Sequence, residues 1–168
     1  SFGVITPFRY CEIENLKTEL SKEDVRQKAF FYYFDNDQSR FTCSDDKLNQ
    51  IWELCKYSMK ATSFCWYYVH GDRERIPYEA DAYINQLSHY CVDPEYAIGK
   101  QTIEYFMEYP TWPTEWLLHT AMLIYQDYYY TGDTELIEKY YEALKHKTLI
   151  GLVREDGLIS TQTPKVTE

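Results

Sequence analysis

The feature that most constrains this chain is a change of hydrophobic period at Ser44. The apolar residues that follow fall at steps of three and four: Leu48, Ile51, Trp52, Cys55 and Met59. This spacing predicts an amphipathic helix over residues 45–62. Ser44 is a suitable N-cap, and the two aspartates after it suit the positive end of the helix dipole. We expect Trp52 in the core and Cys55 as a buried thiol.

Two further helices follow in the same manner. Pro77 suits a first helical turn, which predicts a helix from about residue 77 to Cys91. Its expected apolar face is formed by Ala80, Ile84, Leu87 and Cys91. Asp93 is a suitable N-cap and Pro94 suits the first helical turn, so the two together predict a third helix, which ends before Pro110.

Two more helices complete the pattern. Thr114 is the candidate cap of a fourth helix, which reaches about Tyr130. Residues 131–133, "TGD", stop that helix and cap a fifth, because glycine permits a left-handed residue and Asp133 can accept the next N–H bonds. The fifth helix should run to about Leu152, before an extended piece. Short connectors imply antiparallel helical hairpins, so we predict a mainly α fold. The sequence shows no fixed repeat period, which places a helical-repeat scaffold second.

Residues 1–43 have a different pattern. "PFRYCEI" alternates, "KAFFYYF" is an aromatic run of strand length, and "FTC" follows a polar turn. These features predict a few β-strands. Two or three strands do not form a stable sheet alone, so we expect them to be the closing edge of a preceding domain. The chain opens without methionine, and we interpret it as a piece of a longer protein.

Charge and composition exclude several functions. A net charge of −10 argues against nucleic acid and against electrostatic binding to a membrane, which both need basic surfaces. The five cysteines are widely spaced, with no C-x-x-C pair, so we expect no structural metal. No acidic loop has calcium-ligand spacing, and no cofactor is expected. A neutral substrate or a protein partner fits this composition, whereas the oligomeric state stays open.

The densest group of charges lies within "CWYYVHGDRERIPYEADAYINQLSHY", residues 65–90. Four carboxylates, from Asp72, Glu74, Glu79 and Asp81, stand there beside His70, Arg73 and Arg75. A solvated, salt-bridged helix start explains such a string, since charged helix starts are common. On this string alone we prefer that explanation, and an active site is the alternative that stays open.

Four segments together resemble bacterial α-L-rhamnosidases. They are "FTCSDDKLNQIWELC", "GDRERIPYEADAYINQL", "YPTWPTEW" and "YYYTGDTELIEKYYEAL". The resemblance implies that residues 44–168 are the first part of a six-hairpin (α/α)6 catalytic barrel. It also implies that residues 1–43 are the C-terminal strands of a β-sandwich domain.

The family signature, Glu-x-x-Gly-Trp-x-Gly-Asp, matches "ERIPYEAD". The resemblance therefore implies Glu74 as the catalytic acid, with Tyr78 at the aromatic position and Asp81 at the final acid. Pro77 and Ala80 replace the two glycines. The Asp-Cys-Pro that usually precedes the signature is absent, and "YVHG" stands there, so Asp72 or His70 would have to replace the lost carboxylate. This departure leaves open a different sugar specificity or a relative without activity.

The implied reaction is inverting hydrolysis of a terminal α-L-rhamnosyl or related deoxy-sugar linkage. Such enzymes use two carboxyls roughly 6.5 to 9.5 Å apart, with room for a water. Neighbouring carboxylates would favour the protonated form of Glu74, whereas Arg73 and Arg75 would oppose it. The family's base comes from later in the barrel, outside this fragment, so we expect the 168-residue chain alone to be inactive.

Sugar sites combine stacking aromatics with polar groups, because a sugar has apolar faces and polar edges. The expected substrate-binding residues are Asp72, Arg73, Tyr78, Asp81, Trp112, Glu115 and Trp116. For Trp112, a ligand platform and a loop anchor are equally good interpretations. We interpret His119, in the middle of a helix, as structural.

Two other functions remain as alternatives to a glycosidase. The first is a carbohydrate-binding relative without turnover, and the second is a helical scaffold for protein partners. A carbohydrate would be the partner of a glycosidase and of the carbohydrate-binding relative, whereas the scaffold would bind proteins. Analogy with polysaccharide-degrading bacterial enzymes favours a periplasmic or extracellular location.

Overall fold

The computed structural model describes residues 8–69 and 73–160. Within these ranges the chain is mainly helical, with five α-helices joined by short connections: α1 (Asp46–Thr62), α2 (Glu79–Tyr90), α3 (Ala97–Glu108), α4 (Leu118–Thr131) and α5 (Glu135–Lys147). Three short 3-10 helices accompany them: η1 (Lys22–Asp24), η2 (Thr114–Leu117) and η3 (Ile150–Leu152). None of the helices in the described ranges combines the length and apolar character needed to cross a membrane.

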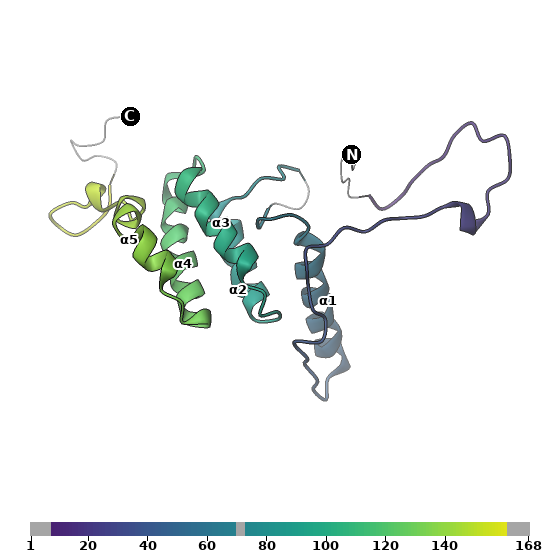
Figure 1. Cartoon of the computed structure of the whole chain (residues 1–168), viewed down its shortest axis with the longest axis horizontal. Coiled ribbons are helices and arrows are strands. Elements are labelled where there is room, and N and C mark those ends of the chain that lie inside the picture. The colour runs from purple at the N-terminus through teal and green to yellow at the C-terminus, as the bar shows by residue number, and fades with distance from the viewer. Residues whose placement is uncertain (1–7, 70–72, 161–168) are drawn as a thin grey trace.

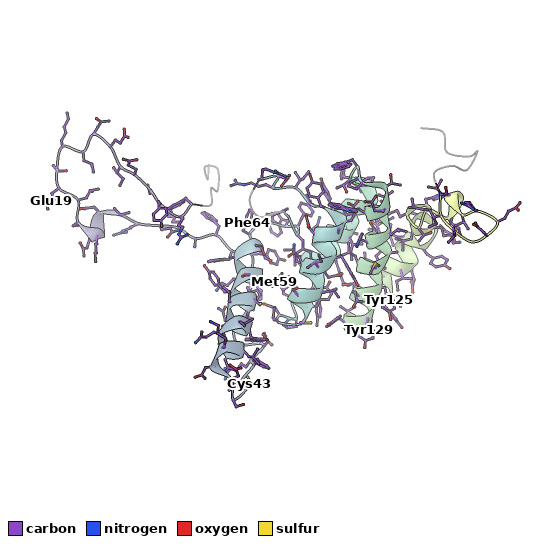
Figure 2. The ribbon with its side chains drawn as sticks, turned by 180° about the vertical axis from the view of Figure 1, so that it is seen from behind. Glu19, Cys43, Met59, Phe64, Tyr125 and Tyr129 are labelled. Carbon is purple, nitrogen blue, oxygen red and sulfur yellow. The ribbon has the colours of Figure 1, made fainter. Side chains whose placement is uncertain are left out.

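Helices α2 to α5 lie side by side, whereas α1 stands at one edge of the group (Figure 1). The core lies between α2, α3, α4 and α5. It consists of Tyr68, Ala82, Ile98, Ile103, Phe106, Leu123, Ile124 and Leu136. Beyond α1 the N-terminal part of the chain makes a long excursion away from the helices, in which Glu19 lies (Figure 2).

The strands predicted for residues 1–43 are not found in the described part of that segment, residues 8–43. The segment is irregular except for η1, and most of its apolar side chains are exposed. A strand needs a hydrogen-bonded neighbour. Nothing in the described part of the chain pairs with these residues as a ladder, so their β-type pattern produces no sheet here.

The first helix forms where the sequence predicted, with a small change at its start. Asp45, not Ser44, is the N-cap, and its carboxylate accepts a hydrogen bond from the Lys47 amide at 2.8 Å. The predicted apolar face is largely exposed, and Cys55 is exposed, against our expectation. Met59 is the buried apolar residue of α1, on the side that faces the other helices (Figure 2). Trp52 is only half-buried.

The second helix differs more. It begins at Glu79, after an N-cap at Tyr78, and no residue of the predicted apolar face is fully buried: Ile84 and Cys91 are exposed, and Ala80 and Leu87 are half-buried. The opposite face is buried and is rich in polar groups: besides Ala82 it contains Glu79, Gln86, His89 and Tyr90. The prediction of the buried face was wrong because these polar side chains find hydrogen-bond partners in neighbouring elements, which offsets part of the usual cost of burying them.

The junction between α4 and α5 was predicted correctly. Gly132 has φ of 70°, the left-handed conformation that glycine adopts without steric cost, and its N–H bonds to the Tyr128 carbonyl. The Asp133 carboxylate accepts a hydrogen bond from the Glu135 amide at 2.9 Å. Helix α5 ends at Lys147, before the predicted end, because Leu149 has φ of 58° and breaks the helical path.

A short segment before α1 connects α1 to the α2–α3 turn. We call residues 32–39 the N-terminal strap. The Tyr32 amide donates to the Ser63 carbonyl at 2.6 Å, and the Asp35 amide donates to the Asp93 carboxylate at 2.7 Å. From α1, the buried Lys56 ammonium donates to the carbonyl oxygens of Asn36 and Ser39 at 2.5 and 2.7 Å.

Candidate active site

The turn before α2 carries the candidate acid. Glu74 has a half-buried side chain, 24% exposed, and its Oε1 accepts hydrogen bonds from Nε and Nη2 of Arg73. Arg75 has φ of 54°, a left-handed conformation that a non-glycine residue rarely adopts. Such backbone strain is found frequently at functional sites, where the surrounding structure maintains it.

The Arg73 pair bears directly on the chemistry of Glu74. A guanidinium favours the ionised form of a neighbouring carboxylate, whereas a proton donor must carry its proton. The Arg73 side chain is 86% exposed, so water competes for this ion pair. Displacement of Arg73 would therefore be a modest cost for a ligand that replaced its hydrogen bonds to Glu74.

The segment that follows the C-terminal end of α3 contacts this turn. The loop of residues 109–113 leads into η2, and the Trp116 ring contacts the Tyr78 ring edge-on, with centroids 5.7 Å apart. The Trp112 side chain, in the loop itself, is 84% exposed. The structure thus brings Tyr78 and Trp116 together, two residues that the sequence predicted for one site.

The other predicted residues have less defined places. Asp81 lies in the first turn of α2 and is half-buried, and Glu115 lies exposed in η2. Asp72 and His70 lie outside the described residues. His119 is half-buried, and its Nδ1 donates to the Trp116 carbonyl oxygen at 3.2 Å. This contact fits the structural role expected for His119, because it supports η2 from α4.

One carboxylate of the charged turn has a role that the sequence did not indicate. Glu79 is completely buried, and its carboxylate accepts two hydrogen bonds from Thr111: one from the backbone N–H, at 2.9 Å, and one from the hydroxyl. Sequence reasoning treated Glu79 only as a negative charge near Glu74. No local pattern predicts its partner, which lies 32 residues further along the chain.

Beneath the candidate site, the buried face of α2 is held by polar contacts. The Tyr68 hydroxyl and His89 Nδ1 are 2.6 Å apart, and the Tyr90 hydroxyl donates to Asp127 at 2.8 Å. The Gln86 amide donates to the Leu123 carbonyl at 3.0 Å. Burial lowers the pKa of His89 and raises the pKa of Asp127, because it disfavours the charged form of each. This network fixes α2, the helix that begins at the candidate site.

A comparison with known proteins identifies the family of the chain. Residues 36–161 match the family described as bacterial alpha-L-rhamnosidase 6 hairpin glycosidase domain. The chain belongs to this family. No curated protein and no solved structure was found to match the chain.

Membership in the bacterial α-L-rhamnosidase six-hairpin family confirms the resemblance seen in the sequence. The helical architecture of the described residues is consistent with a six-hairpin domain. A glycosidase domain implies chemistry of the glycoside hydrolase class and a carbohydrate as substrate. Within the described ranges, no three metal-ligating side chains gather at one place.

Proposed function

We propose that this chain carries the proton donor of an inverting, α-L-rhamnosidase-like glycoside hydrolase. The substrate would end in an α-L-rhamnosyl or related deoxy-sugar unit. Glu74 would be the general acid, and the general base would come from a residue outside these 168 residues. The observation that carries the proposal is the position of Glu74: the sequence resemblance aligns it with the acid of the family signature, and its side chain lies half-buried in a strained turn.

The surroundings of Glu74 support a sugar ligand. Tyr78 and Trp116 form an aromatic pair next to the turn, and the exposed Trp112 lies in the adjoining loop. Aromatic faces suit the C–H surfaces of a sugar ring. We propose that Arg73, Asp81 and Glu115, together with Asp72, bind hydroxyl groups, since charged groups form strong hydrogen bonds. In this scheme Arg73 leaves Glu74 when the substrate binds, and Glu74, once protonated, donates a hydrogen bond to the glycosidic oxygen.

We further propose that residues 1–43 end a β-sandwich domain and that residues 44–168 begin the catalytic barrel. The exposed aromatic side chains before α1, such as Phe31, Tyr33 and Phe41, support this division. Side chains of this kind are typical of strands that pack against another layer. Limited proteolysis of the full-length protein tests the division, because the residues around the boundary should be cleaved only slowly if they lie between packed domains.

The test of the acid is hydrolysis of a chromogenic α-L-rhamnoside by the full-length protein. In Glu74→Gln we expect kcat to fall by about 10²- to 10⁴-fold, the contribution typical of a positioned general acid. Glu142→Gln, which changes an exposed glutamate on α5, is the matched control and should retain the wild-type rate. Equal activity of wild type and Glu74→Gln would show that Glu74 is not the acid. Inversion would appear as a β-anomer in the first product seen by NMR.

A carbohydrate-binding relative without turnover is the second candidate. The specific observation in its favour is the Arg73–Glu74 ion pair, because a neighbouring guanidinium favours the ionised carboxylate, and an ionised carboxylate cannot donate a proton. Binding of L-rhamnose without hydrolysis of any α-L-rhamnoside would support this second function. We expect the isolated chain to show no turnover in either case, and appreciable hydrolysis by it would contradict the assignment of the base.

A further inference from the structure

The buried carboxylate of Glu79 holds the loop that presents Trp112. Glu79 is the first residue of α2 and is completely buried. One carboxylate oxygen accepts the Thr111 backbone N–H and the other accepts the Thr111 hydroxyl. A buried carboxylate is costly unless it is hydrogen-bonded, and within the described residues both oxygens of Glu79 obtain their bonds from Thr111 alone. These two bonds fix the position of Thr111 in the loop.

The same loop is also held where it leaves α3. Lys147, at the end of α5, is buried, and its ammonium donates to the Phe106 carbonyl in the last turn of α3 at 2.7 Å. Burial lowers the pKa of Lys147, and the nearby charge of Glu79 opposes that change. A buried cation and a buried anion from two different helices thus hold the start of the loop and its middle.

Trp112 directly follows the residue that Glu79 holds. Its indole is 84% exposed, although burying such a large ring would gain free energy. Glu79 also lies next to the other two aromatic residues of the candidate site. Tyr78 directly precedes it in the chain, and the Tyr78 ring contacts the Trp116 ring. A rigidly held loop with an exposed aromatic ring is the arrangement expected of a binding platform, because less freedom is lost when the ligand binds.

We propose that Glu79 is a positioning residue for the sugar-binding site: through Thr111 it sets where the Trp112 ring stands relative to Glu74. The proposal rests on the proposed glycosidase function for its substrate, but the positioning itself is a property of the protein alone. Glu79 is not required to touch the substrate. Its effect is transmitted through two hydrogen bonds to the loop.

The test compares Glu79→Gln with Glu79→Met in the full-length protein. A glutamine can still accept the Thr111 N–H and donate to its hydroxyl, whereas a methionine of similar size can do neither. For an α-L-rhamnoside we expect KM to rise about tenfold in Glu79→Met with a smaller change in kcat, and to stay within about threefold of wild type in Glu79→Gln. Trp112→Ala should raise KM similarly, and the double variant should add little to either single change.

Tyr90→Phe is the matched control, because it removes a buried hydrogen bond from the same helix without touching the loop. We expect it to reduce stability and leave KM unchanged. The proposal is overturned if Glu79→Met leaves KM unchanged while stability falls, or if the effects of Glu79→Met and Trp112→Ala on KM are additive.

A second readout does not need turnover. Time-resolved fluorescence anisotropy, taken as the difference between each protein and its Trp112→Phe version, reports the motion of the Trp112 ring. We expect faster depolarisation in Glu79→Met than in wild type, and wild-type behaviour in Glu79→Gln. Unchanged anisotropy in Glu79→Met overturns the positioning role. A clear change in anisotropy in a protein that neither binds nor hydrolyses rhamnosides would support the positioning role and refute the proposed function.

Discussion

Replacement of Gly99 by alanine sets helix propensity against packing, and the structure indicates which effect is larger. Gly99 lies in α3, where alanine would stabilise the helix by about 0.8 to 1 kcal/mol. However, a Cβ at this position would lie 2.9 Å from Cζ of Tyr90 and 3.1 Å from its Cε1, and closer still to its hydroxyl oxygen. Carbon atoms in good contact are about 3.5 to 4.0 Å apart. The Tyr90 ring would therefore have to move.

Movement of Tyr90 has two costs. Overpacking of this kind typically costs about 1 to 3 kcal/mol. The hydrogen bond from Tyr90 to Asp127 is buried, and a bond to a charged partner contributes about 1.5 to 3 kcal/mol. After the gain in propensity is subtracted, we expect Gly99→Ala to destabilise the chain by about 1.5 to 5 kcal/mol.

Urea unfolding followed by circular dichroism measures this change. The midpoint should fall in Gly99→Ala with little change in the denaturant slope. Gln101→Ala, at an exposed position of the same helix, is the control and should be neutral. In a Tyr90→Phe background the cost of Gly99→Ala should shrink, because the closest atom is gone. A stabilised Gly99→Ala variant, or the same cost in both backgrounds, would refute the reasoning.

Two further predictions concern buried ionisable groups. Burial lowers the pKa of His89 below its ordinary value of 6.5. As the pH falls below 6.5, the unfolded chain therefore takes up a proton on this side chain more readily than the folded chain does. The contribution of the neutral His89 to stability is present above pH 6.5 and is lost as the pH falls below that value. Urea midpoints between pH 7.5 and 5.5 should fall less steeply in His89→Gln than in wild type, and parallel curves would contradict this. Lys56→Met should leave the carbonyls of Asn36 and Ser39 without their buried donor. We therefore expect amide hydrogen exchange in residues 35–40 to become faster, by an amount equivalent to about 1 to 3 kcal/mol. Lys60→Met is the control and should have little effect. Equal exchange in the two lysine variants would show that Lys56 does not hold this turn.

Local signals were sufficient for much of the fold. The helix at 45–62 and the junction at Gly132 and Asp133 were predicted to within a few residues, because caps, glycine conformation and helical period depend on near neighbours. The start of α3 was less accurate. The Asp93 carboxylate accepts bonds from the amides of Glu95 and Asp35, so it organises the loop and the strap, and the helix begins only at Ala97.

The face of α2 could not be predicted by periodicity. A hydrophobic period assumes that polar side chains avoid the core, yet Gln86 and His89 are completely buried. Their partners, Leu123 and Tyr68, come from other segments, 37 and 21 residues away in sequence. The same limit applied to the candidate site, where the family signature indicated Glu74 and Tyr78 but gave no sign of the contact between Glu79 and Thr111.

The N-terminal strap has a practical consequence for where this domain begins. A boundary drawn from helix propensity would start the protein at Ser44 and discard residues 32–39. Such a cut would remove the backbone contacts to Ser63 and Asp93 and the two carbonyl acceptors of the Lys56 ammonium. Helix α1 buries little apolar surface of its own, so its orientation against α2 would then have few remaining constraints. A truncated protein intended for expression should therefore begin before Phe31, even though the first helix starts 15 residues later.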